Sequence, residues 1–154
     1  MRQLGELTRA LIGLNLFVAE NIESVADEPK IIPSGKEATL DTGVNEPGVI
    51  LYRQTYTGVF NINNYPFKRN PVELLLGYVS AYLLENGNGD YQIPQPEINI
   101  DVLDHYMADI EIQIKFVEDV YGVEDPDGLI PLNGKTYRIA DPVIDYVLSG
   151  DVAA

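Results

Sequence analysis

The spacing of hydrophobic positions changes along the chain from a helical to a strand-like period, and this predicts the order of the elements. Near the amino terminus the apolar side chains recur every three or four residues, on one stripe of a helix. They are Leu4, Leu7, Leu11, Leu14 and Val18. The pattern predicts a helix over residues 3–19. It favours a helix over a secretory signal peptide, because Asn15 interrupts the apolar run and no small-residue cleavage site follows.

The next two segments differ in regularity. Residues 20–48 contain several prolines and glycines and keep no period, so a long irregular segment is expected there, with at most a short strand at 31–32. Residues 49–63 then alternate, and β-branched and aromatic side chains dominate, which predicts a long strand. One face of this strand carries Tyr52, Gln54, Tyr56, Gly58, Phe60 and Ile62.

A second helix is predicted over residues 71–85, because both of its ends carry signals. Asn70 is a candidate N-cap, Pro71 suits the first helical position, and Glu73 completes a capping box. Gly87 supplies a stop, since glycine tolerates the left-handed conformation that ends many helices.

This second helix is apolar around most of its circumference. Such a helix is buried on more than one side, and the second cover is either the first helix or another subunit. Leu76, Tyr78 and Leu83 are therefore the candidate residues for the core or for a subunit interface.

The clearest alternation predicts a hairpin over residues 97–118 that turns at Asp104 and His105. Its first strand has Ile98, Ile100 and Val102 on one face. In its second strand the predicted core positions are Ile110, Ile112, Ile114 and Phe116. The predicted outward positions are Asp109, Glu111, Gln113 and Lys115. A register slip of one residue would bury the charges, so the pattern fixes the pairing.

A short last strand is predicted near Lys135–Ile139, followed by an acidic tail over 141–154 with a possible helical turn at 142–148. The order of elements predicts one α+β domain over residues 1–154. Its parts are an N-terminal helix, a long strand, and a capped, buried helix packed on a mostly antiparallel sheet.

Charge is distributed unevenly along the 154 residues. Asp and Glu number 24 against 10 Lys and Arg, a formal charge of −14, and residues 70–154 hold sixteen of the acids but three of the bases. This balance disfavours binding of nucleic acid or anionic membrane through bulk electrostatics. No apolar run approaches the roughly 20 residues of a membrane span. The acids either form one acidic face or only keep the fold soluble.

Candidate chemistry is weak. The chain has no cysteine, and its single histidine, His105, sits in a predicted turn without a serine nucleophile motif. Asn86, Asn88 and Asp90 have the spacing of calcium ligands, but Tyr91 stands where such a loop needs glycine. Two carboxylates could still meet in the fold to form a hydrolase site. No catalytic, metal or cofactor residue is predicted, and a structural or binding role is favoured over an enzyme.

Four segments of the chain carry a resemblance to a known family. Strand residues 57–62, the helix start at 71–75, the helix end at 82–86 and hairpin residues 109–114 together resemble the tail completion protein R family of temperate contractile-tailed phages. The resemblance implies a tail terminator: a small subunit that assembles as a ring, most often a hexamer, on the head-proximal end of the tail. Its implied partners are itself, the tube and sheath proteins, and the head-neck connector. Its implied location is the virion tail, after assembly in the host cytoplasm, without membrane, cofactor or catalytic residues.

DNA must pass through such a ring without adhering to it. Acids that line the channel would repel the phosphate backbone, and Asp101, Asp109 and Glu111 are the candidate channel-facing acids. The alternative function is an acidic protein that mimics DNA and inhibits a nucleic-acid-binding enzyme.

Overall fold

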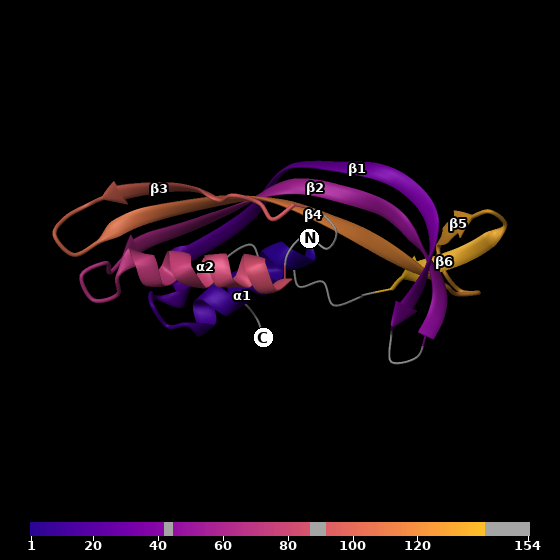
Figure 1. The fold of residues 1–154 in the computed structure, drawn as a ribbon, viewed down its shortest axis with the longest axis horizontal. Helices are drawn as coiled ribbons and strands as arrows, with labels where there is room; N and C mark the ends of the chain where they lie inside the picture. Colours follow the sequence, from indigo (N-terminus) through magenta and orange to yellow (C-terminus); the bar gives the residue numbers. More distant parts are fainter. Residues whose placement is uncertain (42–44, 87–91, 141–154) are drawn as a thin grey trace.

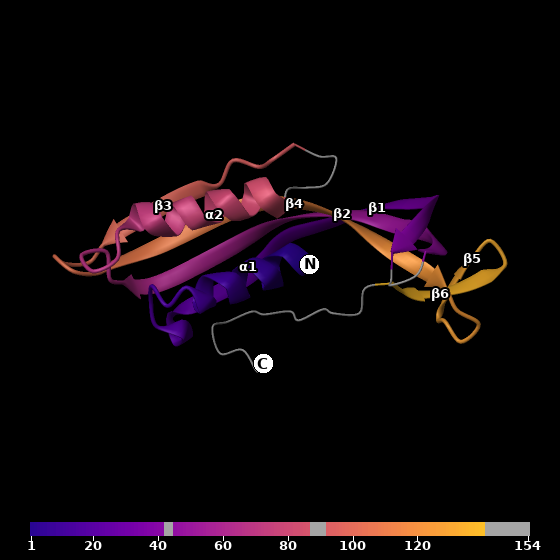
Figure 2. The ribbon, with the colours of Figure 1, turned by 60° about the horizontal axis from the view of Figure 1, so that its bottom comes forward.

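A long antiparallel sheet arches over two helices that lie together at one end of the molecule (Figures 1 and 2). The computed structural model describes residues 1–41, 45–86 and 92–140. The elements in chain order are α1 (Arg2–Gly13), the 3₁₀ turn η1 (Ala19–Asn21), β1 (Ile22–Asp41), β2 (Asn45–Tyr65), α2 (Val72–Asn86), β3 (Glu97–Val102), β4 (Ala108–Glu124), β5 (Ile130–Leu132) and β6 (Lys135–Ile139). The mixture of a dominant sheet with two helices agrees with the predicted α+β class.

The three longest strands pair side by side in the order β1–β2–β4. β4 pairs with β2 along one edge, and its other edge is shared by β3 at the start of the strand and β6 near its end. β5 pairs with β6, and every pairing is antiparallel. Among the described strands, β1 and β3 therefore lie on opposite edges of the sheet.

The core lies between the concave face of the sheet and the two helices. Buried side chains alternate along β2 and β4, and the predicted inward positions Ile110, Ile112, Ile114 and Phe116 are all fully buried. Their alternates, from Asp109 to Lys115, face the convex, helix-free side. The predicted hairpin register is confirmed. Gly58 is required in this core, because a Cβ there would stand 2.7 Å from the ring of Phe116.

The first helix is shorter than the spacing predicts. α1 ends at Gly13, and Asn15 takes a left-handed conformation with φ of 56°. Asparagine tolerates this conformation better than most residues, so the chain turns there and Val18 lies outside the helix.

The expectation of an irregular segment over 20–48 is wrong. Residues 22–41 form β1, and β2 begins at Asn45. β1 is an edge strand whose pairing is interrupted by two register shifts, between Asp27 and Lys30 and between Pro33 and Lys36. Because much of it is exposed on both faces, selection for alternation is weak and the sequence shows none. The tail 141–154 and its possible helical turn lie outside the described residues, as do Asn88, Asp90 and Tyr91 of the weak calcium motif.

α2 occupies the predicted position but is covered on fewer sides than expected. One stripe, formed by Leu75, Val79 and Leu83, is buried against the sheet. The side-chain amide of Asn70 donates to the Leu16 carbonyl at 2.8 Å and ties the start of α2 to the segment after α1. The opposite side of α2 has no cover from the described part of the chain, because Leu74 and Leu84 are 54% and 69% exposed.

Candidate functional surfaces

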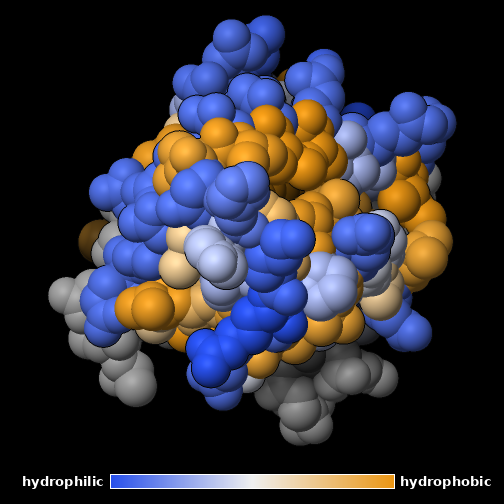
Figure 3. Space-filling model, turned by 90° about the vertical axis from the view of Figure 1, so that its left-hand side faces the viewer, coloured by the Kyte–Doolittle hydropathy of each residue, from blue (hydrophilic) through white to orange (hydrophobic). Residues whose placement is uncertain are grey.

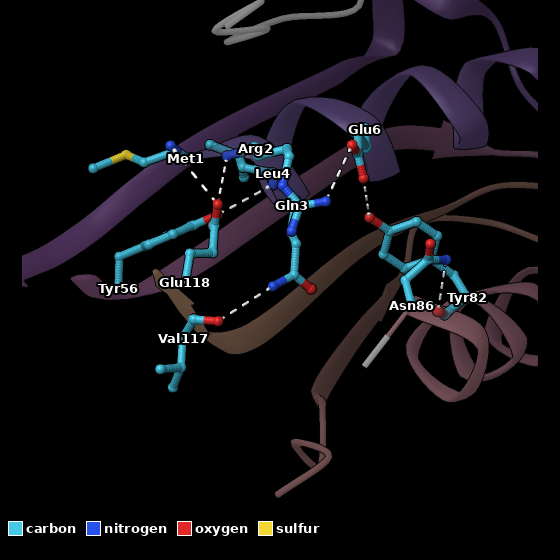
Figure 4. A network of polar contacts seen from close by, with 10 residues as sticks. All are labelled: Met1, Arg2, Gln3, Leu4, Glu6, Tyr56, Tyr82, Asn86, Val117 and Glu118. Carbon is cyan, nitrogen blue, oxygen red and sulfur yellow. Dashed lines mark hydrogen bonds and ion pairs between the residues drawn. The ribbon is translucent and has the colours of Figure 1, made fainter. Parts of the chain in front are cut away.

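A buried carboxylate joins the first helix to the sheet (Figure 4). Glu118 of β4 accepts a hydrogen bond from the backbone N–H of Arg2 at 2.7 Å and a short one from the hydroxyl of Tyr56 on β2. The same hydroxyl accepts from the backbone N–H of Leu4 at 3.2 Å. The amino group of Met1 lies 3.9 Å from the carboxylate. The first N–H groups of a helix lack partners within the helix, and a negative charge is favourable beside them.

The tyrosines of this region are locked in their neutral form. Burial, followed by the nearby charge and hydrogen bond of Glu118, raises the pKa of Tyr56 far above its ordinary value. Burial and the neighbouring Glu6 likewise raise the pKa of Tyr82, whose hydroxyl donates to Glu6 Oε2 at 3.0 Å. A tyrosine that holds its proton so strongly is neither a base nor a nucleophile near neutral pH. The network therefore positions α1 against β2, β4 and α2.

Sequence reasoning missed Glu118, although a signal for it was present. Glu118 has the same parity along β4 as Ile114 and Phe116, so strict alternation places it on the core face. A carboxylate at a core position needs partners. Those partners come from residues far away in the sequence, in α1 and β2.

The three candidate channel-facing acids lie together on the convex face of the sheet. Asp101 stands directly opposite Asp109 in the β3–β4 register, and Glu111 follows two positions further along β4. The Asp109 carboxylate accepts the backbone N–H of Asn64 at 3.0 Å, and Glu111 accepts the amide of Gln113 at 2.8 Å. Like charges directly opposite each other on a sheet destabilise it. Folding alone therefore does not account for the Asp101–Asp109 pair.

The candidate helix residues divide between the core and its edge. Leu83 is buried, whereas Leu76 and Tyr78 are half-buried and pack against the rim of the core. More strongly exposed apolar side chains lie on the outer side of α2 and on β3. We call them the α2–β3 surface: Leu74, Leu84, Ile98, Ile100 and Val102. The β3 members pair with core positions of β4, so they project to the same side of the sheet as α2. Figure 3 looks at the left-hand end of the molecule in Figure 1 and shows apolar patches on its surface interspersed with hydrophilic side chains.

No catalytic constellation appears among the described residues. His105 lies exposed in the β3–β4 turn, where the backbone N–H groups of Tyr106 and Met107 donate to Asp104 and lower the pKa of that carboxyl. An apolar pocket of about 320 Å³ lies at the other end of the sheet, lined by residues that include Leu51, Ile130 and Leu132. The described part of the chain holds no group of three metal-ligating side chains, and none of its helices has the length and apolar character needed to cross a membrane.

Comparison with known proteins assigns the family. Residues 1–142 match the family of the P2 phage tail completion protein R (GpR). The chain belongs to this family. It is also 25% identical over 121 residues to an uncharacterized 19.2 kDa protein of the rep-hol intergenic region of Haemophilus phage HP1, a match that covers 77% of this chain and 69% of the relative. No solved structure matches the chain.

Membership in the GpR family gives the chain a role in a phage tail. The family is one of structural tail proteins, in agreement with the structural or binding role that the sequence favours. A tail completion role implies association with other tail proteins and a place in the virion tail.

Proposed function

We propose that this protein terminates the tail as a hexameric ring on the head-proximal end of the tube and sheath. The ring ends polymerisation there and offers a surface to the head-neck connector. The observation that carries the proposal is the uncovered α2–β3 surface of a protein from a tail completion family. Exposed apolar surface of this kind is typical of a subunit interface.

The convex face of the sheet supports a second part of the proposal. Asp101, Asp109 and Glu111 would line the channel and keep passing DNA from adhering to the wall. In this arrangement the like-charge pair lowers the stability of the subunit slightly and serves the assembled tail. DNA passes without specific binding.

The same face disfavours the DNA-mimic alternative. Lys115 and Arg53 stand on it beyond the acidic end, in register with Thr57 and Asp119. A DNA mimic requires acids spaced along one exposed face, and cations on that face would weaken its attraction to a basic enzyme.

The test combines imaging with tail length. Purified protein, alone or mixed with tail tubes, is expected to form rings in negative stain, with tubes carrying a ring at one end. A phage that lacks the gene is expected to produce tails of uncontrolled length that fail to join heads. Tails of normal length that join heads without the protein would refute the proposal. So would a protein that stays monomeric with and without tubes.

A further inference from the structure

The α2–β3 surface combines exposed apolar side chains with an acidic rim. Leu74 and Leu84 flank Gly77 and Ala81 on the outer side of α2, and a Cβ added at Gly77 would meet nothing within 4 Å. The exposed carboxylates beside these residues belong to Glu73, Glu85 and Glu97, and neither α2 nor β3 contains a lysine or arginine. A fitting partner therefore presents an apolar centre with cations beside it.

Such a partner exists in the chain itself, on the opposite edge of the sheet. Residues 30–36 of β1, which we call the arm segment, expose Ile32 by 55%, and Ile32 pairs with Arg53, so it projects from the convex face together with Lys30. Lys30 and Lys36 bound the segment and no acid lies between them. Its apolar centre and cationic ends complement the α2–β3 surface.

The arm segment offers side chains and not a free strand edge. A register shift interrupts the β1–β2 pairing at each end of it, and Pro33 lacks the N–H that an added strand would need. Packing of Ile32 against another surface covers this side chain without requiring the sheet to continue from one copy to the next.

Charge decides between two modes of self-association. A two-fold contact between two α2–β3 surfaces would bring the glutamates of both copies together, and neither α2 nor β3 supplies a cation to offset them, which is unfavourable. A contact between the α2–β3 surface of one copy and the arm segment of another pairs opposite charges. Because it joins two different surfaces on opposite edges of the sheet, it repeats head to tail, and head-to-tail contacts close into rings where the rotation permits.

We infer that the arm segment of one copy packs Ile32 against the α2–β3 surface of the next copy, with Lys30 and Lys36 beside its acidic rim. The inference rests on the proposed ring and assigns the interface between its subunits. It leaves Asp101, Asp109 and Glu111 on the convex face, where the channel proposal needs them.

The absence of cysteine in the chain permits a direct cross-linking test. Ile32→Cys and Ile100→Cys are made as single variants, and preparations that show rings in negative stain are treated with a short bismaleimide. A mixture of the two variants is expected to give a cross-linked dimer, whereas each variant alone gives none. Leu129→Cys, at an exposed residue at the other end of the sheet, is the matched control and is expected to give no cross-link with either variant.

The outcomes of this experiment distinguish a wrong interface from a wrong proposed function. Rings without a cross-link in the mixture overturn the inference and leave the proposed function intact. Cross-linking of Ile100→Cys with itself also overturns the inference, because it indicates a two-fold contact. Failure to form rings, with or without tubes, overturns the proposed function and the interface with it.

A charge exchange provides a second test. Two double variants reverse the charge on one side of the contact: Lys30→Glu with Lys36→Glu, and Glu85→Lys with Glu97→Lys. Each is expected to raise the protein concentration needed for ring formation roughly tenfold or more, since like charges then face each other. All four substitutions in one chain should restore the original concentration. Lys135→Glu changes the charge elsewhere and is the control. Failure of the fourfold variant to recover, with its circular dichroism spectrum unchanged, overturns the inference.

Discussion

At the scale of single residues, Glu118 determines how the first helix lies on the sheet. Its carboxylate receives donors from α1 and from Tyr56, so one buried charge fixes two elements. Such a group stabilises only while its partners remain, because an unsatisfied buried carboxylate is costly. Tyr82 and Glu6 extend the same connection from α1 to α2.

Tyr56→Phe is expected to lower the free energy of unfolding by about 1–3 kcal/mol, because it leaves the buried carboxylate of Glu118 with one donor fewer. Urea denaturation followed by circular dichroism measures the loss. Tyr121→Phe, at an exposed position of β4, is the control and should change stability by less than about 0.5 kcal/mol. Equal stability of the two variants would contradict the assigned role of the Glu118 network.

The raised pKa values of Tyr56 and Tyr82 predict sensitivity to alkaline pH. In the folded protein both hydroxyls keep their protons above pH 10, whereas in the unfolded chain they ionise near that pH. The unfolded state then binds fewer protons, so stability is full below about pH 10 and falls as the pH rises further. The urea midpoint should drop between about pH 10 and pH 11, and by less in Tyr82→Phe. A midpoint that is constant over this range would contradict the prediction.

At the scale of elements, the sequence predicted the helices and strands of which one side is buried and the other is more exposed. β4 has one buried and one more exposed face, so alternation predicts the register of the β3–β4 hairpin, and Ile110 and Ile112 lie where the pattern places them. β1 gave no such signal because it is an interrupted edge strand. α2 is the intermediate case: its ends were predicted, but an apolar circumference cannot tell a side buried in the chain from one left for a partner.

Two adjacent leucines of α2 separate folding from assembly. Leu83 is 2% exposed, so Leu83→Asp buries an unpaired carboxylate and is expected to unfold the protein. Leu84→Asp places the same group in solvent and should leave thermal unfolding nearly unchanged while it abolishes ring formation. Circular dichroism and negative-stain imaging of both variants make the comparison. A folded Leu83→Asp variant, or a Leu84→Asp variant that still assembles, would contradict this account of α2.

At the scale of the whole molecule, the arched sheet separates two surfaces with different properties. Its concave side carries the helices (Figures 1 and 2) and the α2–β3 surface, and the strand register places the paired acids on its convex side. The sequence indicated that the second half is acidic but could not place the acids, because sequence distance does not report which face a side chain occupies. Cross-strand pairing of β3 with β4 brings Asp101, Asp109 and Glu111 together.

The convex acids lead to a prediction about DNA passage. Phosphates that approach a wall of carboxylates are repelled over about 10 Å at 0.1 M salt, whereas lysines would attract them and slow the strand. Asp101→Lys with Glu111→Lys should therefore leave tail length normal and slow DNA delivery to the host. Folding should not suffer, because the first substitution replaces a like-charge pair across from Asp109 with an attractive one. Glu124→Lys, at the far end of β4, carries the same kind of charge change away from this cluster and is the control. Delivery at the normal rate by the double variant would contradict a channel position for these acids, and equal slowing by the control would assign the effect to net charge instead.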